Sequence, residues 1–410
     1  MQNQLAQVGQ SQRGFVNTNG PDCNHGKLRL NLVFISAVAD QAFFATLLSV
    51  WRKHGYALEI WSEMSERDYR NARGFTSRLG MRFRINVLFP LRVGLLLLLG
   101  GNRRGRILIV TSTPFFMATI AGFLKRRTDA VCQMLYDLYP DALVVAGKID
   151  ARSVTSAVIG WTVSAGMRRC ELTVFPGERL RRYAEKTYGP CPCSISIPVG
   201  SDGAHLRFER DDRKDELINV VYVGNFGYMH DYRTLADLLR AGLPHGIKVT
   251  FYASGYNYER FKSASVWWPK ETRDRVVFEN PLGHEQWLQV MKKGEVGLVL
   301  FVEGAEKVAF PSKTFSAMAA GQAILAVTPL ASDLADIVAS NNCGWVVGPG
   351  DVAGLRAHME EMIRNHAILK QKQIAAAEAA FEKYDVASLA LQWMGLFQRL
   401  QANIENNEKT

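Results

Sequence analysis

Cysteine is scarce in this sequence, with only six among 410 residues. Six cysteines are too few for a disulfide-stapled scaffold, and they favour a reducing compartment. Cys191 and Cys193 stand one residue closer than the redox CxxC pattern requires, and no paired CxxC or HExxH spacing occurs, so the sequence predicts no metal site. With 48% hydrophobic and 21% charged residues, the composition excludes a wholly disordered chain, a collagen and a coiled coil.

Acidic residues are nearly absent from one stretch of the chain. The whole sequence has 49 Lys and Arg against 39 Asp and Glu, a net charge of +10. Between Glu66 and Arg127, 13 basic residues stand against only two acids, so this window carries +11 and the rest of the chain about −1. Apolar residues are interleaved with the basic ones. Such a surface suits an anionic membrane leaflet, with roughly 1 kcal/mol for each basic residue near the lipid.

We therefore expect residues 67–127 to hold a membrane-facing surface. A solvated basic face over a buried helix is the alternative. No nucleic-acid-binding motif accompanies the charge, so no nucleic-acid partner is predicted. The residues expected to face the membrane are Arg82, Arg84, Arg92, Arg103 and Arg104.

The apolar runs fall short of a membrane span, which needs about 20 residues. Residues 93–101 are too few, and the uncharged stretch 107–124 is interrupted by Thr111-Ser112-Thr113-Pro114, which we interpret as a turn between a strand and a helix. Residues 1–26 are polar and lack the apolar core of a secretory signal, which predicts a flexible tail. We expect a soluble cytoplasmic protein that lies on the inner face of the cell membrane without crossing it.

Short apolar, β-branched runs alternate with helical patterns, which is typical of a parallel sheet with helices on both faces. The alternation restarts after a polar segment, so we predict an α/β protein with two Rossmann-like, doubly wound domains facing across a cleft. We expect domains at 27–200 and 218–385, a linker at 201–217, and a helix at 386–410 that can cross back to the N-terminal domain. Ligands bind such sheets at the carboxyl ends of the strands, here in the cleft.

The strands expected from these patterns divide evenly between the two halves, and most of the expected helices lie in the second half. The strands are 28–36, 58–63, 107–111, 131–137, 172–175 and 194–198, then 218–223, 249–253, 276–279, 296–301, 323–327 and 344–347. The helices are 42–54, 115–127, 153–169 and 178–188, then 232–240, 285–293, 313–320, 334–340, 352–366, 368–384 and 389–405.

A glycine loop follows the strand expected at 218–223. Gly224 and Gly227 let the backbone approach a phosphate closely, and the next helix, capped by Asp231, supplies N–H donors and a positive dipole. A plain tight turn that needs glycine is the alternative.

A second phosphate-binding candidate is a helix that Pro311 or Ser312 starts and Gly321 ends. Lys313 and Thr314 lie in its first turn, where a lysine opposes the helix dipole. With an anion bound there, the lysine becomes a phosphate clamp beside free N–H groups and a hydroxyl. An ordinary capped helix with its lysine in solvent is the alternative.

In this order, the motifs resemble GT-B glycosyltransferases, in particular the GT4-like group of bacterial envelope and exopolysaccharide enzymes. In the second half of the chain the resemblance is carried by YVGNFGYMHDYRTL (222–235), VGLVLF (296–301), FPSKTFSAMAAGQAILA (310–326) and NNCGWVVGPGD (341–351). In the first half it is looser, and is carried by MLYDLYPDAL (134–143), VFPGERLRRYAEKTYG (174–189) and ISIPVGSDGAHL (195–206).

The resemblance implies transfer of a sugar from a nucleotide-diphosphate donor on the C-terminal domain to an acceptor on the N-terminal domain, with retention of the anomeric configuration. The diphosphate would lie between the glycine loop and the helix of Lys313, which would neutralise the leaving group. The resemblance implies no metal or other cofactor, because the lysine and the helix dipole do the work of a divalent ion. The residues it assigns to the donor are Gly224, Asn225, Gly227, Tyr228, Pro311, Ser312, Thr314 and Ser316.

This sequence departs from the family pattern at two carboxylates. Many GT4 enzymes carry two glutamates eight positions apart, the second of which binds the donor ribose, and those positions here are Val308 and Ser316. Ser316 can still make one hydrogen bond. The glycine-rich loop usual after the first strand is also absent, and Ser36-Ala37-Val38-Ala39-Asp40 stands in its place.

On the acceptor side, Tyr136 and Asp137 follow a buried strand and are expected to face the cleft. We expect Asp137 to act as a base or to orient the acceptor hydroxyl, and a helix or turn cap is the alternative. Ser112 and Thr113 end another strand and are also expected to touch the acceptor. Asp141 is expected to be a cap, and Glu303 and Glu306 are expected to be solvated loop charges.

Three functions follow from these features. The first is a peripheral-membrane glycosyltransferase that extends a polyprenyl-diphosphate-linked or other lipid-linked saccharide in polysaccharide biosynthesis. The second is a nucleotide-sugar 2-epimerase, which would need carboxylates and a histidine near the anomeric carbon. The third is a degenerate protein that binds a nucleotide sugar or a partner transferase without catalysis, an alternative kept open by Val308 and Ser316.

Overall fold

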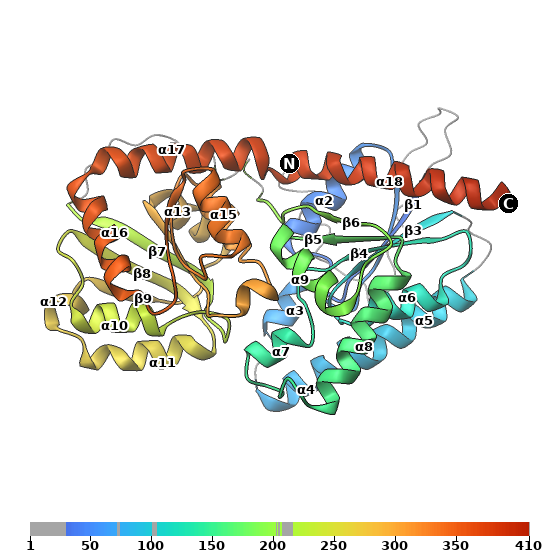
Figure 1. The fold of residues 1–410 in the computed structure, drawn as a ribbon, viewed down its shortest axis with the longest axis horizontal. Helices are drawn as coiled ribbons and strands as arrows, with labels where there is room; N and C mark the ends of the chain where they lie inside the picture. The colour runs from blue at the N-terminus through green and yellow to red at the C-terminus, as the bar shows by residue number, and fades with distance from the viewer. Residues whose placement is uncertain are drawn as a thin grey trace.

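The structure is a computed structural model that describes residues 30–71, 74–100, 105–201, 203, 206 and 216–409. The tail expected at 1–26 and most of the linker expected at 201–217 lie outside the described residues. Two six-stranded sheets, one in each half of the chain, lie side by side with helices on their faces (Figure 1). All their strand pairs are parallel, so the α/β architecture predicted from the sequence is confirmed.

The N-terminal sheet has the strand order β2-β1-β3-β4-β5-β6. Its central strands are buried along their whole length, which is why they appear in the sequence as continuous apolar runs. Every strand expected in this half is present, with small differences at the ends: β1 Asn31–Ile35, β2 Ala57–Trp61, β3 Arg106–Thr111, β4 Ala130–Met134, β5 Leu172–Phe175 and β6 Ser194–Ser196.

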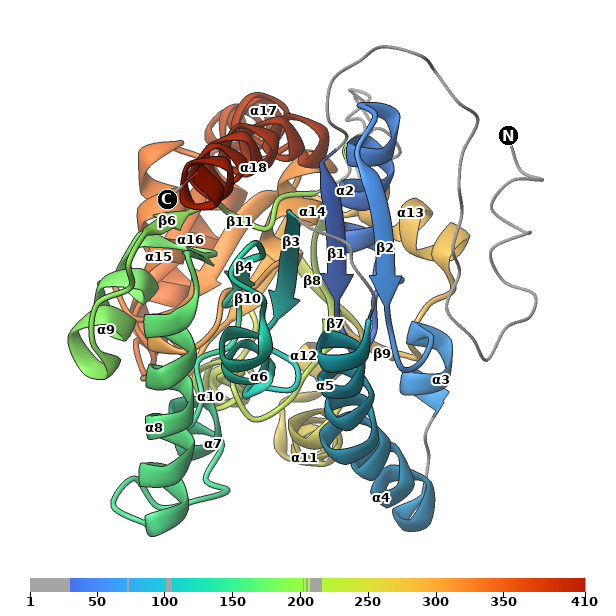
Figure 2. The same cartoon turned by 90° about the vertical axis from the view of Figure 1, so that its right-hand side faces the viewer.

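Helices cover both faces of this sheet. α2 (Ala42–Lys53) packs on one face, while α5 (Phe89–Leu99), α6 (Met117–Leu124) and α8 (Val154–Arg169) form a layer on the other. The basic window begins with α3 (Glu66–Asn71) and α4 (Phe75–Phe83), and a π-helical turn at Arg84–Leu88 joins α4 to α5. Figure 2 shows α4 and the start of α8 extending past the ends of the strands. Two further helices of this domain are α7 (Asp141–Val145) and α9 (Glu178–Tyr188).

The C-terminal sheet has the strand order β12-β11-β10-β7-β8-β9. Its strands are β7 Ile218–Asn225, β8 Ile247–Ser254, β9 Val276–Glu279, β10 Val296–Leu300, β11 Ala323–Val327 and β12 Gly344–Val347. Its helices include the expected α10 Arg233–Ala241, α13 His284–Lys293, α14 Lys313–Ala319, α15 Asp333–Ser340, α16 Val352–Arg364 and α17 His366–Lys383.

Besides the four-residue α12 (Lys270–Arg273), a longer helix of this domain was not expected from the sequence, α11 (Tyr256–Ala264). Tyrosine and asparagine at its start are weak helix formers. Tertiary contacts stabilise it instead, because Phe261 is fully buried with its ring centroid 5.1 Å from that of Phe251.

The chain returns to the N-terminal domain through α18 (Val386–Lys409), which follows α17 (Figure 1). Phe397 of α18 packs edge-on against Trp51 of α2, with ring centroids 4.9 Å apart. The Trp51 indole N–H donates to the Ala390 carbonyl at 3.2 Å. α18 therefore supplies part of the core on one face of the N-terminal sheet.

Candidate active site

The glycine loop begins at the end of β7, which includes Gly224, and a histidine of the loop hydrogen-bonds to its backbone. Gly224 has a φ of 115°, which L side chains rarely adopt. The Gly227 N–H donates to His230 Nδ1 at 3.0 Å. Burial and the neighbouring Lys313 lower the pKa of His230 to about 2, so its ring is neutral and Nδ1 can accept this bond. Asp231 caps the next helix as expected, accepting from two backbone N–H groups at 2.9 and 3.2 Å.

Lys313 lies at the start of α14 and reaches this loop. Its ammonium donates to the Tyr222 hydroxyl at 2.5 Å and lies 3.8 Å from the centre of the same ring. The Tyr222 hydroxyl donates in turn to the Asn225 carbonyl at 2.7 Å. Burial lowers the pKa of Lys313 to about 7. The alternative of a lysine in solvent is therefore wrong, and a half-buried amine lies where an anion would favour its charged form.

The first turn of α14 offers fewer hydrogen-bond donors than the sequence predicted. The N–H groups of Ser312 and Thr314 already donate to preceding carbonyls, at 3.0 and 2.9 Å. The Thr314 hydroxyl is buried and has no partner among the described residues, so Thr314 fills the interior instead of the site. Pro311 is buried beside it, whereas Ser312 is exposed. Ser316 accepts a hydrogen bond from the hydroxyl of Ser201 at 3.3 Å.

Asp137 lies just beyond the carboxyl end of β4, in a turn fixed by Ser112. The Ser112 hydroxyl accepts from the N–H groups of Asp137 and of the residue before it, at 3.2 and 3.4 Å, so Ser112 supports the turn. Burial raises the pKa of the Asp137 carboxyl to about 6. The Leu138 N–H donates to the Val308 carbonyl at 2.8 Å. This bond places the Asp137 turn against the loop that leads to Lys313.

Tyr136 is partly buried and packs against the core on one face of the N-terminal sheet. Its ring stacks on Phe44, with centroids 6.4 Å apart and planes 9° apart, and its hydroxyl is buried without a partner among the described residues. Thr113, at the end of β3, is exposed. Asp141 is not a cap, because its carboxylate accepts from two tyrosine hydroxyls of α9.

Two residues on the C-terminal side of the cleft differ from expectation. Glu306 is only 8% exposed, and its Oε2 has no partner within the described part of the chain, so it is not a solvated loop charge. Its Oε1 lies 3.7 Å from the Lys307 ammonium. Tyr228 stacks on Tyr256 at 4.3 Å between centroids, and its hydroxyl accepts from the Lys148 ammonium of the N-terminal domain at 2.9 Å. Tyr228 therefore bridges the two domains.

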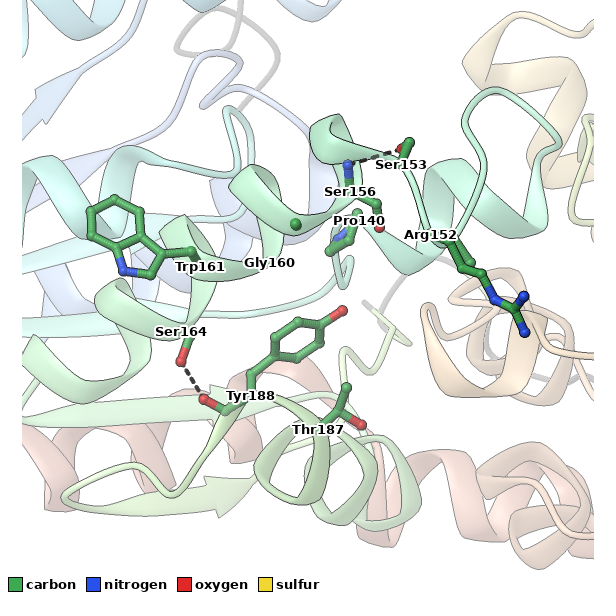
Figure 3. Close-up of a pocket in the computed structure, with 11 residues that line it drawn as sticks. Pro140, Arg152, Ser153, Ser156, Gly160, Trp161, Ser164, Thr187 and Tyr188 are labelled. Atoms are coloured by element: carbon green, nitrogen blue, oxygen red, sulfur yellow. Dashed lines mark hydrogen bonds between the residues drawn. The ribbon is translucent and has the colours of Figure 1, made fainter.

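Two cavities lie near these elements. One of about 60 Å³ lies between the C-terminal sheet, α13 and α14, and Lys313 lines it. It has the volume of about two water molecules in the liquid, too little for a nucleotide. The other, about 430 Å³, lies between α8 and α9 and is lined by Arg152, Trp161 and Tyr188 among others (Figure 3). Asp137 does not line it, so it is separate from the candidate site.

No three His, Cys, Asp or Glu side chains within the described ranges are grouped so that they could hold a metal ion. Lys313 at Tyr222 and Lys148 at Tyr228 are ammonium groups that the described residues place beside the glycine loop.

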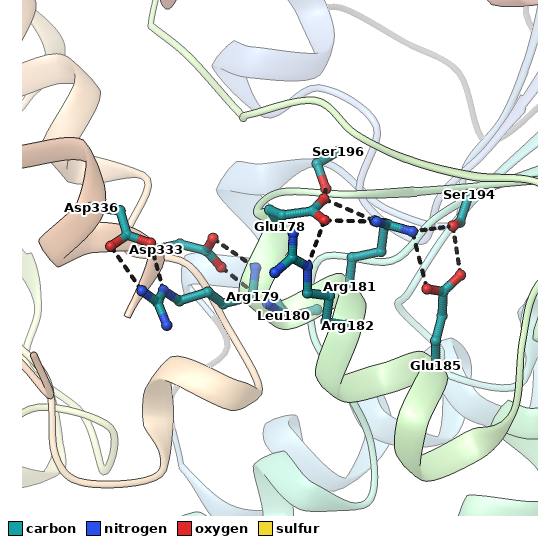
Figure 4. Close-up of polar contacts among 10 residues, drawn as sticks. All are labelled: Glu178, Arg179, Leu180, Arg181, Arg182, Glu185, Ser194, Ser196, Asp333 and Asp336. Atoms are coloured by element: carbon teal, nitrogen blue, oxygen red, sulfur yellow. Dashed lines mark hydrogen bonds and ion pairs between the residues drawn. The ribbon is translucent and has the colours of Figure 1, made fainter. Parts of the chain in front are cut away.

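A carboxylate joins the two domains beside the site (Figure 4). Asp333, the first residue of α15, accepts from the backbone N–H groups of Arg179 and Leu180 at 2.9 and 3.1 Å. The Arg179 guanidinium also donates to both carboxylate oxygens of Asp336, at 2.5 and 3.0 Å. Gly177 permits this approach, because a Cβ at that position would lie 2.3 Å from Asp333 Oδ2. These contacts hold the domains together at the start of α9.

Replacing Gly177 with alanine is expected to loosen this interdomain contact by about 2 kcal/mol, the scale of a lost hydrogen bond to a charged group. The new methyl would displace the Asp333 carboxylate from the two N–H groups. Gly177 has an extended backbone that alanine adopts freely, so strain does not contribute. We expect a larger radius of gyration by small-angle X-ray scattering. Gly283→Ala, also at the start of a helix but with no atom closer than 4.0 Å, should scatter like the wild type.

Several arginines of the basic window form ion pairs with acidic residues of the same domain. Arg84 and Arg92 both contact the carboxylate of Glu63 at 2.9 Å. Arg106 is buried with Asp129 at 2.7 Å. The +11 of the window therefore overstates its free charge, because acids just outside the window neutralise part of it. Of the other residues expected to face the membrane, Arg82 is exposed, and Arg103 and Arg104 lie outside the described residues.

None of the helices in the described part of the chain is both long and apolar enough to cross a bilayer.

Comparison with known proteins finds similarity in structure and none in sequence. No protein-family model and no curated protein matches the chain. The sucrose-phosphate synthase of Thermosynechococcus elongatus matches with a TM-score of 0.71 at 14% identity, over 92% of this chain and all of the other. HepE of Anabaena, solved with UDP and glucose, matches with a TM-score of 0.63 at 13% identity, over 90% of this chain and all of the other.

A third solved structure, an α,α-trehalose-phosphate synthase (UDP-forming) from Burkholderia vietnamiensis, matches with a TM-score of 0.63 at 11% identity, over 92% of this chain and 99% of the other. Each match spans both domains of the chain, so it covers the arrangement of the two sheets as well as each sheet. The chain has the GT-B fold of two Rossmann-like domains, as its motifs predicted.

Proposed function

We propose that the protein is a glycosyltransferase that transfers a sugar from a nucleotide-diphosphate donor to a lipid-linked saccharide acceptor in polysaccharide biosynthesis. The observation that carries this proposal is the half-buried Lys313 amine against the glycine loop, with Asp137 brought to the same cleft from the other domain. The donor is proposed to be a UDP-sugar. In support, HepE was solved with UDP and glucose, and an Escherichia coli trehalose-6-phosphate structure was solved with UDP-2-fluoro glucose.

Lys313 supplies the positive charge that a departing diphosphate requires. Burial holds its pKa near 7 in the free protein, and a bound diphosphate raises that pKa because an opposite charge favours the charged form. Donor binding above pH 7 therefore takes up a proton. A preorganised cation away from bulk water stabilises developing negative charge more than water does. We therefore propose a metal-independent reaction, and turnover with and without EDTA should be equal.

Asp137 acts on the acceptor in this proposal. None of the described residues donates a hydrogen bond to its carboxylate, so the carboxylate is free to accept one from an acceptor hydroxyl. It would orient that hydroxyl toward the anomeric carbon or take its proton. We propose retention of configuration, in line with the glycosyl transfer with retention described for a trehalose-6-phosphate synthase of the same fold.

We propose that the protein works at the inner face of the cell membrane, where lipid-linked saccharides are found. The exposed Arg82 and the apolar residues around it support this location. Arg84 and Arg92 support it less, because each is already paired with Glu63.

Melting and turnover with a panel of UDP- and GDP-sugars test the proposed function. A donor at 100 times its Kd should stabilise the folded state by about 2.7 kcal/mol, and the melting temperature should rise accordingly. Transfer should require a lipid-linked acceptor. A melting shift without UDP release would show a non-catalytic binding protein, and UDP release without acceptor, with inversion at C2 of the sugar, would show an epimerase. No shift with any nucleotide sugar would contradict the donor site itself.

A further inference from the structure

Two groups of exposed apolar side chains project from one end of the N-terminal domain. Each of these side chains leaves more than half of its surface exposed. Figures 1 and 2 both place α4 and the start of α8 at this end, where the strands of the N-terminal sheet have their carboxyl ends. We call the groups the α4 foot (Phe75, Leu79 and Phe83) and the α8 foot (Val154, Val158 and Trp161).

The spacing within each foot places its residues on one side of a helix. The α4 foot repeats every four residues, and the α8 foot follows at four and then three. No residue of α4 is fully buried. Met81 packs against the core while partly buried, whereas the three residues of the α4 foot are exposed and do not belong to the core. On α5, Leu91 and Leu95 are exposed while the opposite side of the helix packs on the sheet. Helices that are apolar on sides facing away from the core need a second apolar environment.

The helices that carry the feet have charges of one sign only. The sequences of α4, α5 and α8 and the π-helical turn contain no Asp or Glu, whereas Arg78 and Arg82 stand between the apolar residues of the α4 foot. Apolar side chains flanked by cations complement an anionic lipid surface. A second copy of the chain docked on the same surface by twofold symmetry would bring these arginines together, and like charges would oppose that contact.

We propose that the α4 foot and the α8 foot insert into the interface of an anionic lipid bilayer, so that the protein stands on the membrane with the carboxyl ends of its N-terminal strands toward the lipid. Amphipathic helices of this kind bury their apolar face about 5–10 Å into the headgroup boundary. The inference rests on the proposed function in one respect: it would bring Asp137, at the same strand ends, close to a membrane-borne acceptor. It differs from attachment by charge alone, which two paired arginines weaken.

Vesicle flotation of the full chain, without donor or acceptor, tests the two feet separately. The variants are Leu79→Asp with Phe83→Asp for α4, and Val158→Asp with Trp161→Asp for α8. The matched control is Val266→Asp with Trp267→Asp, two similarly exposed apolar residues of the C-terminal domain. Wild-type protein should float with phosphatidylcholine–phosphatidylglycerol vesicles and remain partly bound in about 1 M NaCl, where the Debye length is about 3 Å. Each foot variant should partition at least about tenfold more weakly, and the control should match the wild type.

Three results would overturn the proposal. The first is flotation of both foot variants equal to that of the wild type. The second is wild-type binding that high salt abolishes completely. The third is a wild-type dimer in light scattering that the foot variants dissociate, which would assign the feet to self-association. Melting temperature and UDP binding check that the variants fold, and Phe75→Ser, at the exposed start of α4, is a milder second variant. Because flotation needs no sugar, failure of transfer with intact flotation would count against the proposed function alone.

Discussion

Replacing Lys313 with alanine is expected to lower kcat/KM by roughly 30- to 900-fold, which corresponds to about 2–4 kcal/mol of transition-state stabilisation. In the wild type the Lys313 ammonium contacts Tyr222, next to the glycine loop. In the alanine variant, a diphosphate departing at this loop would lack its main counter-charge. Because the pKa of Lys313 is lowered to about 7, the wild-type enzyme should also bind UDP more weakly as the pH rises above 7. Calorimetric titration with UDP between pH 6 and 9 measures this dependence, and the alanine variant should lose it.

Lys307→Ala is the matched control for this experiment. Lys307 carries the same charge a few residues earlier in the chain, and its side chain is about half exposed. Its loss should leave turnover and the pH dependence of UDP binding nearly unchanged. Wild-type turnover in Lys313→Ala would contradict the role of this lysine, and an equal loss in both variants would indicate a diffuse effect of surface charge.

Replacing Asp137 with asparagine is expected to lower kcat/KM by about 10²–10⁴-fold, the usual contribution of a positioned acid or base. The wild-type profile should also have an acidic limb. Burial raises the pKa of this carboxyl to about 6, so the carboxylate needed by the acceptor is present above pH 6 and is lost as the pH falls below it. Rates measured from pH 4.5 to 8 should fall tenfold per pH unit at the acidic end in the wild type, and this acidic fall should be absent from the variant.

Asp237→Asn controls for the loss of a carboxylate, because Asp237 lies on the exposed side of α10. Its profile should match the wild type. If Asp137→Asn retains the acidic limb, another group is responsible for it and the proposed role of Asp137 is wrong.

Elements that depend on local sequence could be predicted well. β5 (Leu172–Phe175), β9 (Val276–Glu279) and β11 (Ala323–Val327) have the bounds that their apolar runs indicated. Buried parallel strands require continuous apolar side chains, and glycine or a polar residue usually ends them, so the pattern and the structure have the same cause. α11 escaped prediction because it is stabilised by the burial of Phe261 and not by its own helix propensity.

The candidate site could be predicted only in part. Gly224 and Lys313 were identified because phosphate chemistry favours those residue types, but the orientation of Lys313 depends on Tyr222, which is 91 positions away in the chain. The burial of Tyr136 depends on Phe44 of another helix. The partner of Arg84, Glu63, lies outside the window in which charges were counted. Each missed feature is a contact between segments distant in sequence, about which local patterns carry no information.

The position of α18 has a consequence for folding during synthesis. The N-terminal sheet ends with β6 at Ser196, whereas the helix that completes the core over Trp51 begins at Val386. At about 5–20 residues per second, the ribosome needs roughly 10–40 s to make the intervening segment. During that interval the nascent N-terminal half exposes the apolar patch that α18 later covers, so chaperones that recognise such patches have their longest opportunity there.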